Sequence, residues 1–254
     1  MSAAGGQEMS TSFGRATASY EAGRPGYPLE AIEWMLQPTR DDASREPLRV
    51  ADVGAGTGKL TRALRATGAE LVAIDPDAAM LAALTEAVPG VPTMVGTAEA
   101  LPLPDASVDA VVLGQAWHWV EPRAGSAEAA RVLRPGGVLG LIWNIRDART
   151  PWVVQMTEIM HGSNAEALIA TGGPEVGEPF GALETKTFEW SRPMTGASLM
   201  EMARSRSYVI TASDTERARI EAALLALFAE LPELRDGGSI ELPYLTHAFR
   251  AVRP

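Results

Sequence analysis

The feature that most restricts the fold is an alternation of short apolar segments with Ala-rich helical segments between residues 48 and 143. The helical segments lie at 58–67, 77–87 and 121–133. Parallel neighbours in a sheet need a crossover connection, which is usually a helix. We therefore predict a doubly wound α/β core with helices on both faces, which binds ligands beyond the carboxyl ends of its strands. The predicted strands lie at 49–53, 70–75, 91–95, 108–113 and 138–143.

The alternation ends after Asn144. The segments 151–170 and 197–235 have the apolar spacing of helices, whereas 183–190 and 244–252 have the pattern of strands. Two late strands separated by helices predict an antiparallel pair that completes the sheet. The helical material is then inserted over the site as a cap.

Composition excludes several classes of chemistry. None of the 254 residues is a cysteine, so the chain has no disulfide, thiolate zinc site, cysteine nucleophile or cysteine-ligated iron–sulfur cluster. The three histidines are far apart in the sequence, and we predict no metal site. The serines lack the G-x-S-x-G pattern of hydrolases.

The net charge and the hydropathy pattern restrict the classes of partner that we expect for this chain. The formal net charge is −10 and the basic residues are scattered singly, so we expect no nucleic acid partner. The N-terminus has no basic n-region followed by an apolar h-region, and no stretch approaches the roughly 18 apolar residues of a membrane span. We therefore expect a cytoplasmic protein without a membrane span. The pattern does not specify an oligomeric state.

A glycine-rich turn follows the first predicted strand. Its glycines, Gly54, Gly56 and Gly58, permit a positive φ and close approach of a ligand to the backbone, and the helix that follows offers unpaired N–H donors. The spacing G-x-G-x-G differs from the G-x-G-x-x-G of dinucleotide folds, and Leu60 stands where a phosphate-binding loop needs a hydroxyl. An anionic or polar ligand is expected here, and a purely structural tight turn is the alternative.

Asp75 ends the next predicted strand, 17 residues after Gly58. An acidic residue near this spacing binds the two ribose hydroxyls in nucleotide-binding folds. The alternative is that Asp75 caps the helix at 77–87, although Asp77 can serve that purpose instead.

Four segments follow one another in the predicted core: DVGAGTG at 52–58, AIDPDAAML at 73–81, GTAEALPLPDASVD at 96–109 and ARVLRPGG at 130–137. They resemble the successive motifs of the class I S-adenosylmethionine-dependent methyltransferases, of the broad small-molecule type that includes the type 11 and trans-aconitate methyltransferase-like enzymes. The resemblance covers residues 20–145 and implies a Rossmann-like, mostly parallel seven-stranded sheet with an antiparallel late strand, an inserted helical cap and S-adenosylmethionine as cofactor.

The resemblance also implies roles for particular residues. The loop 54–58 lies under the methionine part of the cofactor, supported by Asp52, while Asp75 binds the ribose hydroxyls and Pro76 packs on the adenine. The segment 97–99 faces the adenine edge, although the family usually has Asp where this chain has Thr97. The cofactor-binding residues implied are Tyr20, Arg24, Asp52, Gly54, Ala55, Gly56, Gly58, Asp75, Pro76, Thr97, Ala98, Glu99 and Gln115.

Tyr20 and Arg24 lie in a turn-dense segment that resembles the N-terminal lid of the trans-aconitate methyltransferase-like enzymes. The arginine is suited to the cofactor carboxylate and the aromatic ring to its sulfonium. The alternative is a solvated arginine and a tyrosine that only packs.

An aromatic cluster, QAWHWV at 115–120, follows the strand at 108–113. Gln115 is expected to line the methionine or sulfonium side of the cofactor. His118 is the candidate catalytic base, because an imidazole can accept a proton near neutral pH. A structural histidine held between two core tryptophans is the alternative. His161 ends a predicted helix and could face the substrate, whereas His247 lies in a strand and is interpreted as structural.

These observations predict methyl transfer from S-adenosylmethionine to an O, C or N nucleophile of a small molecule. The cofactor brings its own leaving group, so such a protein needs proximity, alignment and desolvation more than a catalytic triad. The alternatives are an NAD-linked oxidoreductase and a non-catalytic cofactor-binding sensor or partner protein. The predicted parts are a lid segment at 1–28, the cofactor-binding core at 29–145, a helical cap and substrate region with a late strand at 146–240, and the final strand at 241–254.

The cap region favours an apolar or aromatic acceptor, although packing between helices uses the same residue types. The residues concerned are Trp143, Trp152, Met156, Met160, Met194, Met200 and Met202.

Overall fold

A computed structural model describes residues 25–39 and 47–254. The chain divides into two compact units. The core unit comprises Gly26–Ile145, Asn164–Trp190 and Leu245–Pro254, and the described part of the cap unit comprises Pro25, Arg146–Ser163 and Ser191–Tyr244. No helix in the described ranges has the length and apolar character needed to cross a bilayer.

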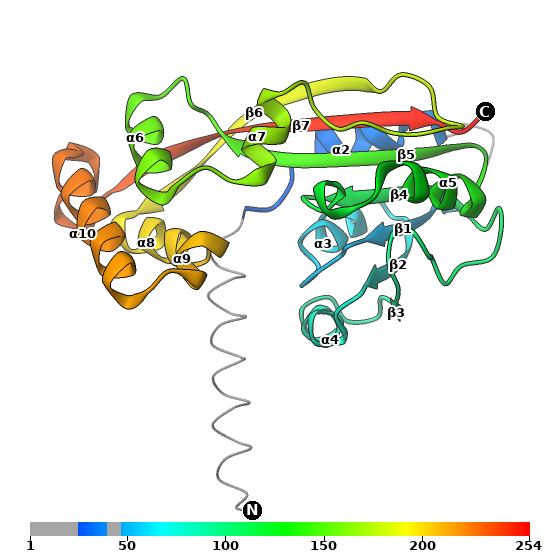
Figure 1. The fold of residues 1–254 in the computed structure, drawn as a ribbon, viewed down its shortest axis with the longest axis horizontal. Coiled ribbons are helices and arrows are strands. Elements are labelled where there is room, and N and C mark those ends of the chain that lie inside the picture. Colours follow the sequence, from blue (N-terminus) through cyan, green and yellow to red (C-terminus); the bar gives the residue numbers. More distant parts are fainter. Residues whose placement is uncertain (1–24, 40–46) are drawn as a thin grey trace, which may run out of the picture. The chain divides into compact units, whose positions relative to one another are not determined.

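A seven-stranded sheet forms the centre of the core unit, with the strand order β3-β2-β1-β4-β5-β7-β6 (Figure 1). The pairs β1–β2, β1–β4, β2–β3 and β4–β5 are parallel, and the arrow of β7 runs opposite to those of its neighbours. This arrangement confirms the predicted doubly wound, mostly parallel sheet with an antiparallel late strand. The strands are β1 Arg49–Val53, β2 Glu70–Asp75, β3 Thr93–Val95, β4 Val108–Gly114, β5 Leu133–Arg146, β6 Glu184–Thr195 and β7 Ser239–Val252.

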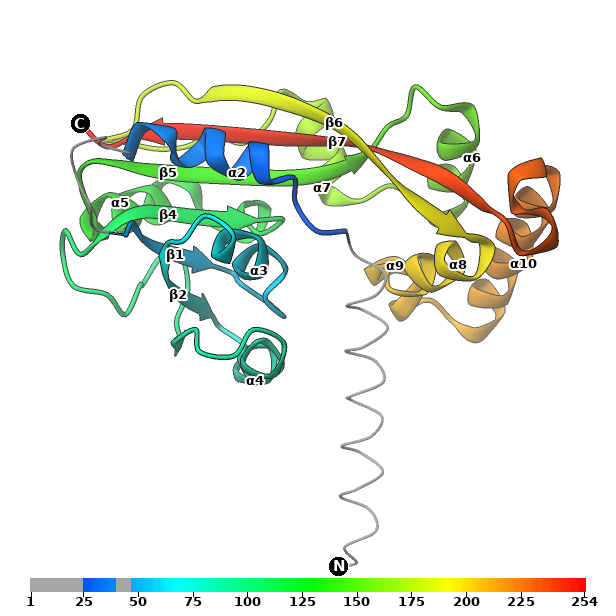
Figure 2. The ribbon, with the colours of Figure 1, turned by 180° about the vertical axis from the view of Figure 1, so that it is seen from behind.

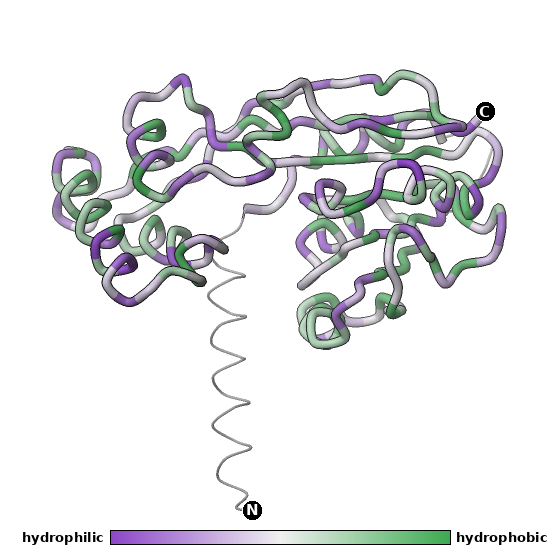
Figure 3. The backbone as a smooth tube through the Cα atoms, viewed as in Figure 1, coloured by the Kyte–Doolittle hydropathy of each residue, from purple (hydrophilic) through white to green (hydrophobic). Residues whose placement is uncertain are grey.

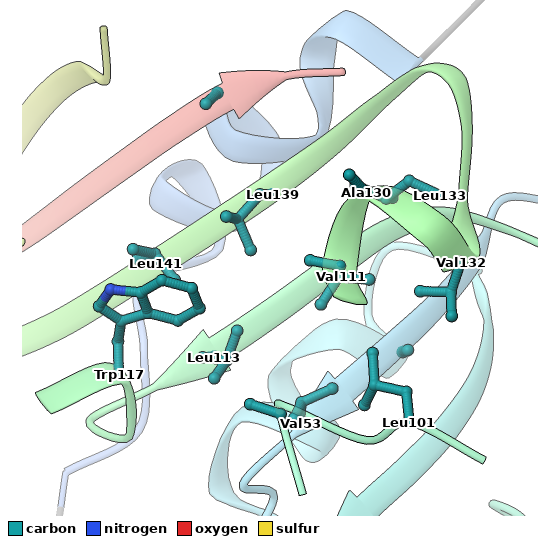
Figure 4. Close-up of a cluster of buried hydrophobic side chains, with 14 of the residues drawn as sticks. Val53, Leu101, Val111, Leu113, Trp117, Ala130, Val132, Leu133, Leu139 and Leu141 are labelled. Carbon is teal, nitrogen blue, oxygen red and sulfur yellow. The ribbon is translucent and has the colours of Figure 1, made fainter. Parts of the chain in front are cut away.

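The two faces of this sheet carry separate hydrophobic clusters, because successive strand residues point to opposite sides. Val50 and Val112 face α2 (Leu29–Leu36) and α3 (Lys59–Arg65), which lie on one side (Figure 2). Val53 and Leu113 face the other side, where α5 (Pro122–Val132) and α7 (Asn164–Ala170) pack (Figure 4). Figure 3 shows hydrophobic residues along β5, whose segment 138–143 is buried. The helix α4 (Ala78–Ala87) packs beside β2 and β3.

The cap unit consists mainly of helices, together with the end of β6 from Ser191 and the start of β7 up to Tyr244. Its longest helix, α10 (Asp214–Glu230), packs against α6 (Pro151–Met160) and α8 (Gly196–Arg204). The side chains of Met156, Met160, Met194, Met200 and Met202 are buried, as is Trp143 on β5. Their burial is what helix and strand packing requires, and it leaves none of these methionines as an open acceptor surface.

The later helical segments are more interrupted than the sequence predicts. The segment 151–170 breaks between α6 and α7 at His161, whose φ is +60°. The segment 197–235 divides into α8, α9 (Ser207–Thr211), α10 and the 3-10 helix η3 (Pro232–Gly237). Ser213 begins α10 by accepting the backbone N–H of Glu216, which stops helix α9 from continuing into it. The late strands are also longer than predicted, since β6 runs to Thr195 and β7 begins at Ser239.

Gly125 on α5 marks a close approach that the turn after β4 depends on. A Cβ at this position would overlap Cγ1 of Val120 and lie 3.2 Å from the Trp117 ring. Alanine is the better helix former, but here the overlap outweighs that gain. We expect Gly125→Ala to lower the free energy of unfolding by about 1–3 kcal/mol in urea titrations.

Gly196 on α8 provides the matched control, because a Cβ there meets no atom within 4 Å. Gly196→Ala should leave the free energy of unfolding unchanged or raise it by up to about 1 kcal/mol. Equal effects of the two substitutions would contradict the packing argument.

Candidate functional site

The carboxyl ends of four parallel strands meet at one edge of the core unit. The register pairs Val53 of β1 with Ile74 of β2, and Asp75 with Val95 of β3. On the other side of β1, Asp52 pairs with Val112 of β4. The glycine loop, Pro76, the segment 97–99 and Gln115 therefore all leave the sheet at this edge. The structure brings the described residues of the predicted cofactor site to one edge of one unit.

Glycine is favoured at each of its three positions in the loop, for a different structural reason in each case. All three have positive φ, +67° at Gly54, +54° at Gly56 and +88° at Gly58. A Cβ at Gly54 would lie 2.7 Å from the Cβ of Ala116, so the loop packs directly against the turn that follows β4. A Cβ at Gly58 would lie 2.9 Å from Cγ of Leu84 on α4.

Gly56 is the exception, because a Cβ there would meet no atom within 4 Å. The backbone of the loop is thus open at its middle residue and closed on both flanks. An open, positive-φ backbone at the start of a helix is where a ligand can approach the main chain. This shape fits a cofactor lying across the loop, and Ala55 is buried beneath it.

Asp75 holds the loop in place. Its Oδ2 accepts the N–H of Gly56 at 2.8 Å, and its Oδ1 accepts the N–H of Asp77 at 2.9 Å. Asp77 in turn caps α4 by accepting the N–H of Ala79. The helix-cap role that the sequence left open for Asp75 therefore belongs to Asp77. A carboxylate has about four acceptor positions, so Asp75 can bind two backbone groups and still accept ribose hydroxyls.

Asp52 is fully buried below the loop. Its Oδ2 accepts the hydroxyl of Thr61 at 2.5 Å, whereas its Oδ1 has no hydrogen-bond partner among the described residues. Burial raises the pKa of Asp52 to about 7; the Thr61 hydrogen bond opposes this rise and the negative charge of Asp75 adds to it. Asp52 is therefore a carboxyl group that holds a proton near neutral pH.

The segment 97–99 forms a tight turn after β3, with a bridge between Thr97 and Ala100. Ala98 is buried, while Thr97 and Pro76 are exposed. Glu99 accepts the backbone N–H of Glu121, which is the N-cap residue of α5. The exposed positions are available to a planar group such as adenine, and Glu99 ties the turn to the next helix.

Gln115 adopts an uncommon conformation, with φ of +57°. Its backbone N–H donates to Ile142 O, and its side-chain Nε2 donates to the carbonyl of Asn144 at 3.1 Å. Residues held in sparsely populated backbone regions concentrate at functional sites.

Asn144 is a residue that the sequence analysis missed. Its Nδ2 donates to the carbonyl of Gly26, and its Oδ1 accepts the hydroxyl of Thr246 at 2.6 Å. Thr246 also accepts the indole N–H of Trp190. This network fixes the segment that enters the core unit at Gly26. A polar residue directly after a run of buried apolar ones was the available signal.

Tyr27 was missed as well. A Cβ at Gly114 would lie 2.7 Å from the Tyr27 hydroxyl, so the tyrosine reaches the carboxyl end of β4. Tyr20 and Arg24, the predicted lid residues, lie outside the described residues.

The aromatic cluster divides its three rings between core and surface. Trp117 in the 3-10 helix η2 (Trp117–Trp119) is buried and donates its indole N–H to the carbonyl of Glu175 (Figure 4). Trp119 is 76% exposed, and its ring centroid lies 4.9 Å from that of His118. His118 is half-buried beside this exposed ring. Within the described ranges, no three His, Asp or Glu side chains gather as a metal site would require.

Comparisons with known proteins agree with this arrangement. Residues 51–141 match the family model described as a methyltransferase domain. The chain is 44% identical to an uncharacterized methyltransferase of Mycobacterium tuberculosis over 97% of both chains, and 33% identical to an uncharacterized methyltransferase-like protein of Schizosaccharomyces pombe over 93% of both. The chain belongs to the class I S-adenosylmethionine-dependent methyltransferases. This membership rejects the NAD-linked oxidoreductase as an alternative.

One solved structure has a fold similar to that of this methyltransferase. The protein, named as a type II methyltransferase from Anaeromyxobacter dehalogenans, matches with a TM-score of 0.63 at 22% identity. The match covers 90% of this chain and 97% of that one. The likeness concerns the fold, since the identity is low.

The buried carboxyl of Asp52 gives a stability test with a defined sign. In the unfolded chain an aspartate releases its proton near pH 4, whereas in the folded protein Asp52 keeps it to about pH 7. Its contribution to stability is therefore complete below pH 4 and is lost as the pH rises to about 7. Relative to Asp52→Asn, the wild type should lose about 1.4 kcal/mol of unfolding free energy per pH unit in that window.

Urea unfolding at half-unit pH steps from 4 to 9 measures this difference. Above about pH 7 the two curves should run parallel. A difference that stays constant from pH 4 to 9 would mean that Asp52 is ionised throughout in the folded protein.

Proposed function

We propose that this methyltransferase transfers the methyl group of S-adenosylmethionine to an O, C or N nucleophile of a small molecule. The observation that carries the proposal is the convergence of the glycine loop, Asp75, the segment 97–99 and Gln115 on one edge of one sheet. When bound, the cofactor supplies an activated methyl group on a sulfonium leaving group. The remaining work of catalysis falls to binding, orientation and exclusion of water.

We assign each residue a part of the cofactor from its position at the carboxyl ends of the parallel strands. The open backbone at Gly56 receives the methionine part, and Asp75 accepts the ribose hydroxyls while holding the loop. Thr97 and Pro76 flank the adenine; the buried Ala98 lies beside Thr97, and Glu99 ties the turn after β3 to α5. Gln115, held by Asn144, lies toward the sulfonium side.

The acceptor is proposed to be a small molecule. Two observations support this: the net charge of −10 disfavours a nucleic acid backbone, and the sequence lacks the Asn-Pro-Pro-aromatic motif used to methylate amino groups of bases. Two sequence relatives with named activities match half of this chain or less. They are a malonyl-[acyl-carrier protein] O-methyltransferase of Methylococcus capsulatus and a demethylmenaquinone methyltransferase of Clavibacter sepedonicus. These two relatives are named for different methyl acceptors. Their similarity to part of this chain therefore agrees with a choice of acceptor by residues outside the matched part.

Asp75 tests the cofactor site. Removing its carboxylate removes charge-assisted hydrogen bonds, so Asp75→Ala should weaken S-adenosylmethionine binding by about 1.5–3 kcal/mol in titration calorimetry. Asp77→Ala is the matched control, because Asp77 caps α4 two residues away. The control should lower stability by about 1 kcal/mol and leave affinity unchanged. Equal losses of affinity in both variants would contradict the assignment.

His118 tests the catalytic proposal. General-base assistance contributes about 10²–10⁴-fold to a rate, whereas a lost positioning hydrogen bond contributes less than about tenfold. Once an acceptor is identified, His118→Asn should reduce turnover more than about a hundredfold with cofactor affinity retained, and the wild-type rate should fall as the pH drops through the histidine range. A loss under tenfold with an unchanged pH profile would assign His118 a packing role, with transfer by proximity alone.

A further inference from the structure

Asp52 has an unusual electrostatic position for a residue so close to a binding loop. It lies immediately before the loop, fully buried, with one carboxylate oxygen bonded to Thr61 and the other without a hydrogen-bond partner among the described residues. Asp75, on the neighbouring strand, bonds the middle of the same loop through Gly56. Two carboxyl groups thus lie beneath one loop.

The charge of Asp75 acts against ionisation of Asp52. It raises the pKa of Asp52, whereas the side-chain and backbone hydrogen bonds of Thr61 lower it. Among the described residues, the other charged groups on the helices of this face are Glu30 and Glu33 on α2, Lys59, Arg62 and Arg65 on α3, and Asp77 and Glu86 on α4, while Asp109 lies at the far end of β4.

The cofactor changes this balance because of its charge. S-adenosylmethionine carries a sulfonium, an ammonium and one carboxylate, so it brings one net positive charge to the loop. Its demethylated product lacks the sulfonium and is neutral overall. A nearby positive charge favours the ionised form of a carboxyl group.

We propose that Asp52 is protonated in the cofactor-free protein and releases its proton when S-adenosylmethionine binds. The proton passes from the Asp52 carboxyl to solvent, and the carboxylate that remains is a counter-charge beneath the loop. No bond of the cofactor is made or broken in this step. The inference rests on the proposed cofactor site and adds to it a proton that accompanies binding.

Two consequences distinguish this role from a structural one. Affinity for S-adenosylmethionine should fall as the pH drops below about 7, by at most tenfold per pH unit, because the proton competes with the ligand. The demethylated product should show a weaker dependence, since it lacks the sulfonium. The ratio of the two affinities should therefore change with pH.

Calorimetry of the full-length protein in buffers of different ionisation enthalpy counts the released protons. At pH 6.5 the wild type should release between about half and one proton per S-adenosylmethionine bound, falling toward zero by pH 8.5. Asp52→Asn should release about one half to one proton fewer at pH 6.5 and bind with an affinity that varies little with pH. This variant keeps all three histidines, so any proton that they release remains in its count.

Thr61→Val provides a second variant that keeps the carboxyl. It removes the hydrogen bond that lowers the pKa of Asp52, so the pH midpoint of the affinity curve should move upward. Wild-type binding without proton release, with flat affinity from pH 6 to 8.5, would overturn the inference and leave the cofactor site intact. Absence of S-adenosylmethionine binding at every pH would instead overturn the proposed site itself.

Discussion

The hydrogen bond between Gly56 N–H and Asp75 Oδ2 is the contact on which the site geometry depends. It joins the loop after β1 to the end of β2. The position of the loop is therefore set by the alignment of these two parallel strands. Gly54 extends this connection to the turn after β4, since it packs against Ala116. Without a glycine at that position the loop and the aromatic turn could not approach each other so closely.

The polar groups at this edge act as a connected set. Asn144 bonds Gly26 and Thr246, and its carbonyl accepts from Gln115. These contacts join segments 118 and 102 residues apart in the chain. A buried polar group without a partner is costly, so each bond in the network restricts the alternatives open to the others. The conformation of Gln115 is therefore fixed by residues from β5 as well as by its own strand.

Residue periodicity predicted the sheet, its mostly parallel strands and the positive-φ glycine turn, because these depend on local pattern and on steric limits of the backbone. The resemblance named Asp52 and Asp75, but pattern alone did not separate Asp75 from Asp77 as the cap of α4 or expose the unpaired oxygen of Asp52. Those properties depend on which groups meet in space. Asn144 and Tyr27 were missed for the same reason. The partners of Asn144, Gly26 and Thr246, lie far from it in the sequence, and Tyr27 packs against Gly114, which has no side chain.

The short helix η2 at 117–119 places one tryptophan in the core and another in solvent. Trp117 is anchored in the core through Glu175, whereas Trp119 leaves a large ring in solvent. An exposed indole forgoes the hydrophobic stabilisation that its burial would give. The methionines of the cap unit are buried and contribute to packing. The exposed ring of Trp119, beside the half-buried His118, is therefore open to a ligand, whereas the methionines are not.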